Sequence, residues 1–349
     1  MRGAGREGLA AGQLGLARQP YDIIVGLTHH KTGTSQMGCL LYHFAYALNL
    51  TNPVYQDNFV LHGNIAMHMA RTTLDKTPLT FLTGHELMKQ CYYQNATKHW
   101  VVCPNQFPCK DGRPILGLAN CFLSLPVANL ALLHFVRNPV DVVVSAYRYH
   151  MQDPPPEKWI EAMKVPNYVP FLEKRGVPLH RLDALGMSRN APEALSYGEL
   201  LRSLPPERGV HLEFWRTLPM MYGMAQQFLM LERHPSALQV RFEDLRFHFN
   251  ATVRTVAEGL YAPYSADTLL AAAHAAKCDP GTWDASRRAQ DSHVTWGKGG
   301  KEQVAALRAA LLRDKSIRRH LCGLQGVLGY AQEEECGEAR AAAAWLRTL

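Results

Sequence analysis

The sequence has no long apolar run. No stretch of its 349 residues reaches the roughly 18 to 20 continuous apolar residues that a membrane-spanning helix needs. Residues 1–20, MRGAGREGLAAGQLGLARQP, also lack the sustained apolar core of a secretory signal. The sequence therefore predicts no membrane span, and we interpret residues 1–20 as a flexible or targeting segment.

Cysteine pairs of the CxxC type are also missing. The eight cysteines are Cys39, Cys91, Cys103, Cys109, Cys121, Cys278, Cys322 and Cys336. Their spacing argues against a zinc ribbon and against a thioredoxin-like redox motif. The even cysteine count and three Asn-x-Thr sequons, at Asn49, Asn95 and Asn250, favour a secretory compartment such as the Golgi lumen. The missing signal favours the cytoplasm, and both locations remain open.

Composition indicates a globular protein, and its charge is that of a protein with anionic partners or simply of one with a basic, soluble surface. Hydrophobic residues make up 47% and charged residues 19%, which excludes a disordered or fibrous chain. The formal net charge is +7, so phosphate, sulfate, nucleic acid and acidic glycans are the partner classes to consider. Because no module of interleaved aromatic and basic residues is present, we expect no nucleic-acid partner.

Hydrophobic periodicity predicts alternating strands and helices, and thus an α/β fold with a central parallel sheet flanked by helices. The expected strands are 21–27, 99–103, 114–118, 130–136 and 238–242. The expected helices begin near Met37, Val140, His211, Phe249 and Glu302.

Pro, Gly and Arg breaks suggest how these elements are organised. We expect a single domain over 21–330, interrupted at about 154–210 by an insertion of loops and short helices that forms a lid. Residues 331–349 are interpreted as a C-terminal helix or tail.

The segment from Gly26 to Ser35, GLTHHKTGTS, has the features of a phosphate-binding loop. It lies between a predicted buried strand and a helix, where the first amides of the helix and a lysine can converge on one anion. Gly33 would let the backbone approach the phosphate closely. The loop lacks the glycine that precedes the lysine in a Walker A motif, so an ordinary ATPase loop does not fit. The candidate ligands are Lys31, Thr32, Gly33, Thr34 and Ser35.

A second candidate phosphate site lies at residues 133–150, LHFVRNPVDVVVSAYRYH. Arg137 ends a predicted strand, Pro139 suits the first turn of a helix, and Ser145 follows two turns later. An arginine at a strand end and a serine on the next helix can hold one phosphate from two sides.

Together these two motifs resemble those of sulfotransferases that use 3′-phosphoadenosine 5′-phosphosulfate (PAPS). H-x-K-T-G-T-[ST] after a strand is similar to their 5′-phosphosulfate loop, and R-x-P-x-x-x-x-x-S to their 3′-phosphate motif. Two weaker similarities are LQVRFEDL at 238–245, in which Phe242 would stack on adenine, and HVTWGKGGK at 293–301, in which Lys298 would contact the 3′-phosphate. The resemblance implies a three-layer P-loop-type fold with PAPS as co-substrate.

The resemblance also implies sulfuryl transfer, without a metal, to a hydroxyl or amine of a carbohydrate or small metabolite. Lys31 would neutralise the leaving phosphate oxygen, and Thr34 would hold the 5′-phosphate. Arg137 and Ser145 would hold the 3′-phosphate. The family's base-bearing strand corresponds here to PILGLANCF, which has no His or Glu. The remaining candidates for the general base are His62, His85 and Glu86.

Two alternatives remain open at this point. A nucleotide or small-molecule kinase of related fold would need a Walker lysine preceded by glycine and an acidic magnesium ligand. A non-catalytic member that binds a sulfated or phosphorylated ligand would keep the phosphate pockets without the base.

Overall fold

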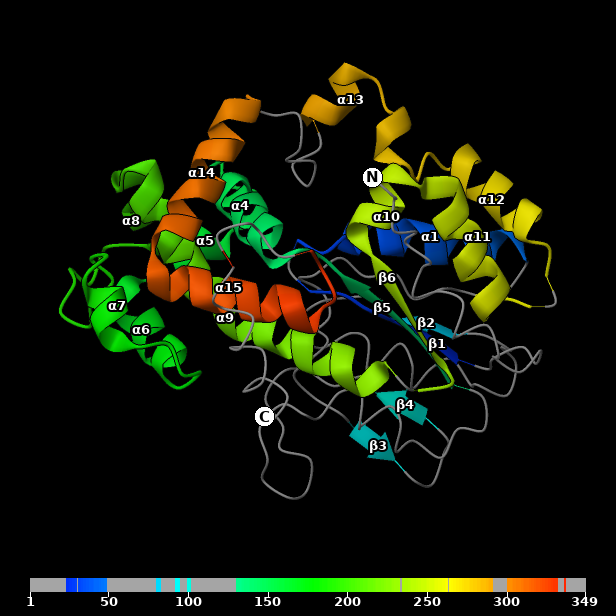
Figure 1. The fold of residues 1–349 in the computed structure, drawn as a ribbon, viewed down its shortest axis with the longest axis horizontal. Helices are drawn as coiled ribbons and strands as arrows, with labels where there is room; N and C mark the ends of the chain where they lie inside the picture. Colours follow the sequence, from blue (N-terminus) through cyan, green and yellow to red (C-terminus); the bar gives the residue numbers. More distant parts are fainter. Residues whose placement is uncertain are drawn as a thin grey trace, which may run out of the picture. The chain divides into compact units, whose positions relative to one another are not determined.

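The structure is a computed structural model that describes residues 23–29, 31–48, 80–82, 92–94, 99–101, 130–232, 234–262, 264–290, 300–331 and 336. These residues form an α/β fold that is mostly helical and includes a parallel sheet (Figure 1). They fall into two compact units that alternate along the chain. The first comprises the described residues of 1–29, 33–136 and 227–282, and the second those of 30–32, 137–226 and 283–349.

The parallel sheet belongs to the first unit. Its strands are β1 (Ile23–Leu27), β2 (Thr80–Leu82), β5 (Leu130–Val136) and β6 (Ala237–Arg241). They lie in the order β2-β1-β5-β6, and every neighbouring pair is parallel. Residues 131–136 of β5 are all buried, as expected for an apolar strand of a parallel sheet. A separate antiparallel pair consists of β3 (Tyr92–Gln94) and β4 (His99–Val101).

Three helices of the first unit pack beside this sheet. They are α1 (Thr34–Ala47), α11 (Phe249–Leu260) and α12 (Ala266–Ala275), with the short α10 (Phe242–Phe247) and the 3-10 turn η2 (Pro280–Thr282) beside them. Helices α1 and α11 pack against the strands of the sheet, and α12 packs against α1 and α11. Their buried side chains form one core with alternate residues of β5 and β6. The Cys39–Cys278 disulfide connects α1 to the segment after α12.

The second unit is helical. Its helices are α4 (Pro139–His150), α5 (Trp159–Ala162), α6 (Val165–Glu173), α7 (Leu179–Asp183), α8 (Tyr197–Ser203), most of α9 (Pro206–Leu231), α13 (Ala285–Gln290), α14 (Lys301–Arg313) and α15 (Lys315–Val327). Both α14 and α15 pack on α4. The Cys322–Cys336 disulfide lies in this unit.

A buried ionic cluster links helices of the second unit. Glu213 on α9 accepts hydrogen bonds from Tyr197 Oη at 2.6 Å and from Arg216 Nε at 2.9 Å. His150 Nδ1 lies 3.1 Å from the same carboxylate. Burial alone would raise the pKa of Glu213, but Arg216 and His150 hold it well below its usual range. The carboxylate is therefore charged and ties α4, α8 and α9 together.

Most of the expected elements are confirmed. Within the described residues, β1, β4 and β5 lie where strands were expected at 21–27, 99–103 and 130–136. The helices expected near Met37, Val140, His211, Phe249 and Glu302 are present. Strand β6 ends one residue earlier than expected because Phe242 begins α10, and α9 starts at Pro206. Helices α12 and α15 were not expected.

The described residues cover only part of the expected domain organisation. Short helices α5 to α8 occupy 154–210, as expected for that insertion, and its role as a lid stays a prediction. The single domain over 21–330 also stays a prediction. Residues 1–20, strand 114–118 and most of 331–349 lie outside the described residues. Among the helices that the structure describes, none is long and apolar enough to cross a membrane.

Candidate functional site

Three neighbouring parallel strands end at the same edge of the sheet. The register aligns Leu27 of β1 with His134 of β5, and Val136 of β5 with Arg241 of β6. The chain therefore leaves all three strands at their carboxyl ends, where ligands of open α/β sheets bind. The segments that follow are the predicted phosphate loop, Arg137 and Phe242, each of which carries one of the sequence motifs.

The phosphate loop adopts a conformation that favours glycine at two positions. Lys31 has φ 64° and Gly33 has φ 102°, both in the left-handed region. A Cβ atom on Gly33 would lie 2.7 Å from Cδ2 of Phe242 and 3.3 Å from Cδ2 of Phe135. The carbonyl of Gly33 accepts from Met37 N at 2.9 Å and so starts α1. Gly33 therefore permits both the turn and the close packing of the loop on the sheet.

Lys31 is held through both its backbone and its side chain. Arg137 Nη1 donates to the Lys31 carbonyl at 2.8 Å, although the two residues are 106 positions apart. The Lys31 ammonium lies 3.7 Å from the centroid of the Tyr149 ring, and Tyr149 is buried on α4. A cation over an aromatic face is attracted by the ring's quadrupole. These contacts fix the geometry of a lysine whose backbone is in a rare conformation.

The start of α4 carries the second predicted phosphate motif. Asn138 caps the helix, since its side chain accepts from Val140 N at 3.0 Å, and Pro139 occupies the first helical position. Gln325 of α15 also donates to the Asn138 side chain, at 3.1 Å. Arg137 and Ser145 flank this turn and are both buried. The expected arrangement of an arginine before the helix and a serine within it is present.

A hydrogen-bonded chain of side chains within the first unit begins at His29, in which His29 and His134 are buried and Gln239 is half-buried. Gln239 Nε2 donates to the Phe228 carbonyl at 3.0 Å, which turns its Oε1 toward His134 Nδ1, also at 3.0 Å. His134 therefore carries its proton on Nδ1 and accepts at Nε2 from His29 Nε2, 3.1 Å away. Burial lowers the pKa of His134 to about 4, against a smaller opposing effect of Gln239. The orientation of the Gln239 amide therefore sets the tautomer of His134, and His134 in turn sets that of His29.

The predicted site residues fall into three groups. Lys31, Thr32, Arg137 and Ser145 belong to the second unit, whereas Gly33, Thr34, Ser35 and Phe242 belong to the first. His62, His85, Glu86 and Lys298 lie outside the described residues. Phe242 is buried in contact with Gly33, so the described packing gives it a structural role at the loop.

Sequence analysis did not identify Tyr149 or the His29–His134–Gln239 chain. His134 gave one signal, because it is a polar residue in an otherwise apolar strand, LALLHFV. His29 stands within the loop motif itself, two residues before the lysine. Within the described residues, no group of three or more His, Cys, Asp or Glu side chains is placed to hold a metal ion.

Searches with known family models, curated proteins and solved structures found no match to this chain. The residues and geometry of the site therefore carry the functional argument.

Proposed function

We propose that the protein is a PAPS-dependent sulfotransferase with a three-layer P-loop-type fold. The observation that carries the proposal is the Arg137–Lys31 hydrogen bond, which joins the two motifs that resemble the 5′- and 3′-phosphate sites of that family. The parallel sheet supports it further, because adjacent strands β1 and β5 end at the same edge and deliver the two motifs there.

In the proposed reaction, the bond between sulfur and the bridging phosphate oxygen of PAPS breaks while sulfur binds an acceptor oxygen or nitrogen. The acceptor's proton passes to a general base, for which His85 and Glu86 are the candidates. Lys31 neutralises the charge that grows on the departing phosphate oxygen. Thr32, Thr34 and Ser35, with the loop amides, bind the 5′-phosphate, and Arg137 and Ser145 bind the 3′-phosphate.

The acceptor proposed is a hydroxyl or amine of a carbohydrate or small metabolite. The two disulfides support the Golgi lumen over the cytoplasm as the proposed compartment, because disulfides persist in oxidising compartments.

Calorimetric titration with two product-like nucleotides tests the donor site. Wild-type protein should bind 3′-phosphoadenosine 5′-phosphate more tightly than adenosine 5′-phosphate, because only the former carries a 3′-phosphate. Arg137→Gln should abolish this preference, since a charge-assisted contact contributes roughly 1.5–3 kcal/mol. Arg148→Gln removes an arginine of α4 that lies beyond the R-x-P-x-x-x-x-x-S motif, which ends at Ser145, and it should retain the preference.

Two outcomes would overturn the proposal. One is a wild-type protein that binds ATP but not 3′-phosphoadenosine 5′-phosphate, which would favour a kinase. The other is an unchanged preference in a folded Arg137→Gln variant, with folding checked by thermal unfolding. If the donor site is confirmed, a screen of acceptors with sulfur-labelled PAPS would then identify the substrate.

A further inference from the structure

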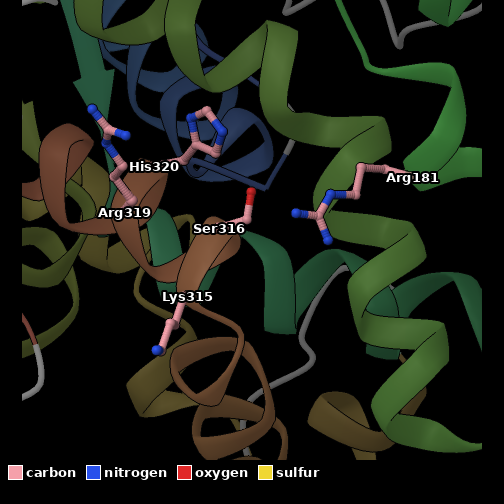
Figure 2. Close-up of a pocket in the computed structure, with 5 residues that line it drawn as sticks. All are labelled: Arg181, Lys315, Ser316, Arg319 and His320. Carbon is pink, nitrogen blue, oxygen red and sulfur yellow. The ribbon is translucent and has the colours of Figure 1, made fainter.

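A pocket in the second unit lies apart, in the sequence, from the phosphate motifs. Its volume is about 660 Å³, and it is lined by Arg181 of α7 and by Lys315, Ser316, Arg319 and His320 of α15 (Figure 2). All five lining side chains are polar, and three of them carry a permanent positive charge at neutral pH. We call it the cationic pocket.

The positive charge of this pocket is only partly compensated. Arg181 has an acidic partner in Asp314, whose Oδ2 lies 4.0 Å from Arg181 Nη1, and both side chains are partly exposed to solvent. An exposed pair at this distance neutralises little. The Asp314 carboxylate also caps α15 by accepting from Ser316 N at 2.8 Å and Ile317 N at 3.0 Å. The pocket therefore depends on its side chains and not on the amides of the helix end.

His320 reports the sign of the field inside the pocket. The Nδ1 atom of its imidazole ring is hydrogen-bonded to the Tyr222 hydroxyl. Burial lowers the pKa of His320, and the positive charges of Arg319 and Arg181 lower it further. The two charges that lower the pKa of this imidazole are both positive, and an anionic ligand would offset them.

The shape and lining of the pocket narrow the class of anion. Figure 2 shows Arg181 reaching toward Ser316, whereas Lys315 points downward and Arg319 upward, both away from Ser316. Cationic groups spread in this way fit several anionic groups on one ligand better than a single ion. The cavity is also many times larger than one sulfate, and because all five lining residues have polar or charged groups, they suit a ligand with a polar carrier.

We propose that the cationic pocket binds a small polyanion that carries several phosphate or sulfate groups on a polar carrier. This site is additional to the donor site, because none of its residues belongs to the phosphate motifs. Arg181 and Ser316 would bind one oxyanion, and Lys315, Arg319 and the imidazole of His320 would bind others.

Calorimetric titrations with two probes test this assignment at an ionic strength of about 0.15 M. One probe is myo-inositol hexakisphosphate and the other is sucrose octasulfate, so the two arms separate phosphate from sulfate sources. We expect the wild-type protein to bind at least one probe. Arg181→Gln/Arg319→Gln should weaken that binding by about tenfold or more. Arg313→Gln/Arg318→Gln removes the same charge from α14 and α15 outside the lining and should leave the affinity within about twofold.

Arg137→Gln separates this proposal from the donor-site proposal. The affinity for the probe should be unchanged in Arg137→Gln, and a loss there would mean that the polyanion binds at the phosphate loop. Failure of the wild-type protein to bind either probe, or equal losses in both double variants, would also overturn the pocket assignment. If Arg181→Gln prevents folding, Arg319→Gln alone serves as the test, since Arg319 is exposed.

Discussion

Two residues of the phosphate loop, Lys31 and Gly33, have left-handed backbone conformations. For Gly33 this conformation has little steric cost, but for Lys31 it costs on the order of 1–2 kcal/mol. The hydrogen bond from Arg137 to the Lys31 carbonyl is one contact that offsets this cost. Strained backbone of this kind is concentrated at functional sites, where the surroundings impose it.

Gly33→Ala should destabilise the protein by roughly 2 to 4 kcal/mol, because the new methyl group meets both the left-handed penalty and the Phe242 ring. Gly176→Ala is the matched control, with φ 83° and no atom within 4 Å of the added Cβ. Gly176→Ala should lower the free energy of unfolding only by the left-handed backbone penalty of about 1–2 kcal/mol. Urea unfolding measures both. Equal losses in the two variants would show that the Phe242 contact contributes nothing.

Lys31→Ala should lower kcat on the order of a hundredfold at saturating PAPS, because the proposed interaction strengthens as charge develops on the leaving oxygen. Tyr149→Leu should lower kcat less, and Tyr149→Phe should keep most activity, since the ring that holds the ammonium remains. Steady-state kinetics with an identified acceptor measure these effects. A raised KM for PAPS with unchanged kcat in Lys31→Ala would make the lysine a ground-state anchor instead.

Among the elements, β1, β5 and β6 determine where the site residues emerge. His134 and Gln239 are register partners on β5 and β6, so the sheet itself places their side chains for hydrogen bonding. His29 follows β1 and completes the chain at its end. The loop after β1 is therefore anchored to β5 by the His29–His134 hydrogen bond and, through His134, to Gln239 of β6.

This histidine chain should make stability depend on pH. His134 has a pKa of about 4 in the folded protein and about 6.5 when unfolded, so the unfolded state binds the extra proton between these values. The contribution of neutral His134 to the free energy of unfolding should be fully present above pH 6.5. The free energy of unfolding should fall by about 3 kcal/mol as the pH drops to 4. A protonated His134 would also present N–H groups to both His29 and Gln239.

Urea unfolding at a series of pH values from 4 to 7.5 measures this dependence. His134→Gln should flatten the acidic side of the stability curve, whereas His180→Gln, at an exposed position of α7, should leave its shape unchanged. A wild-type curve of the same shape as that of His134→Gln would contradict the assignment.

At the scale of the whole molecule, each of the two described disulfides joins two cysteines of the same unit. Cys39 and Cys278 lie in the first unit, and Cys322 and Cys336 in the second. The net charge of +7 is consistent with the two proposed anion sites, the phosphate loop and the cationic pocket.

Removing the two disulfides separately should have unequal effects. Cys39 and Cys278 are separated by 239 residues, and Cys322 and Cys336 by 14. In the chain-entropy account, Cys39→Ser/Cys278→Ser should lose about 5 kcal/mol and Cys322→Ser/Cys336→Ser about 3 kcal/mol. Guanidinium unfolding under non-oxidising conditions measures both. A larger loss from the shorter loop would mean that local packing, not chain entropy, dominates.

Features that depend on short segments were predictable from the sequence. Apolar periodicity identified β1, β5, α1 and α4, because burial of one face leaves a regular pattern in neighbouring residues. Glycine and proline marked Gly33 and Pro139, since each suits a particular backbone conformation. The candidate phosphate residues were found in this way, without any knowledge of their contacts.

Features that depend on distant segments emerged only in the folded chain. Arg137 and Lys31 are 106 residues apart and His29 and His134 are 105 apart, and no local pattern encodes which strands pair or in what register. The cationic pocket likewise needs Arg181 beside a helix that begins at Lys315. Charge, propensity and periodicity act along the chain, whereas pairing of strands and packing of helices bring together residues that the sequence keeps apart.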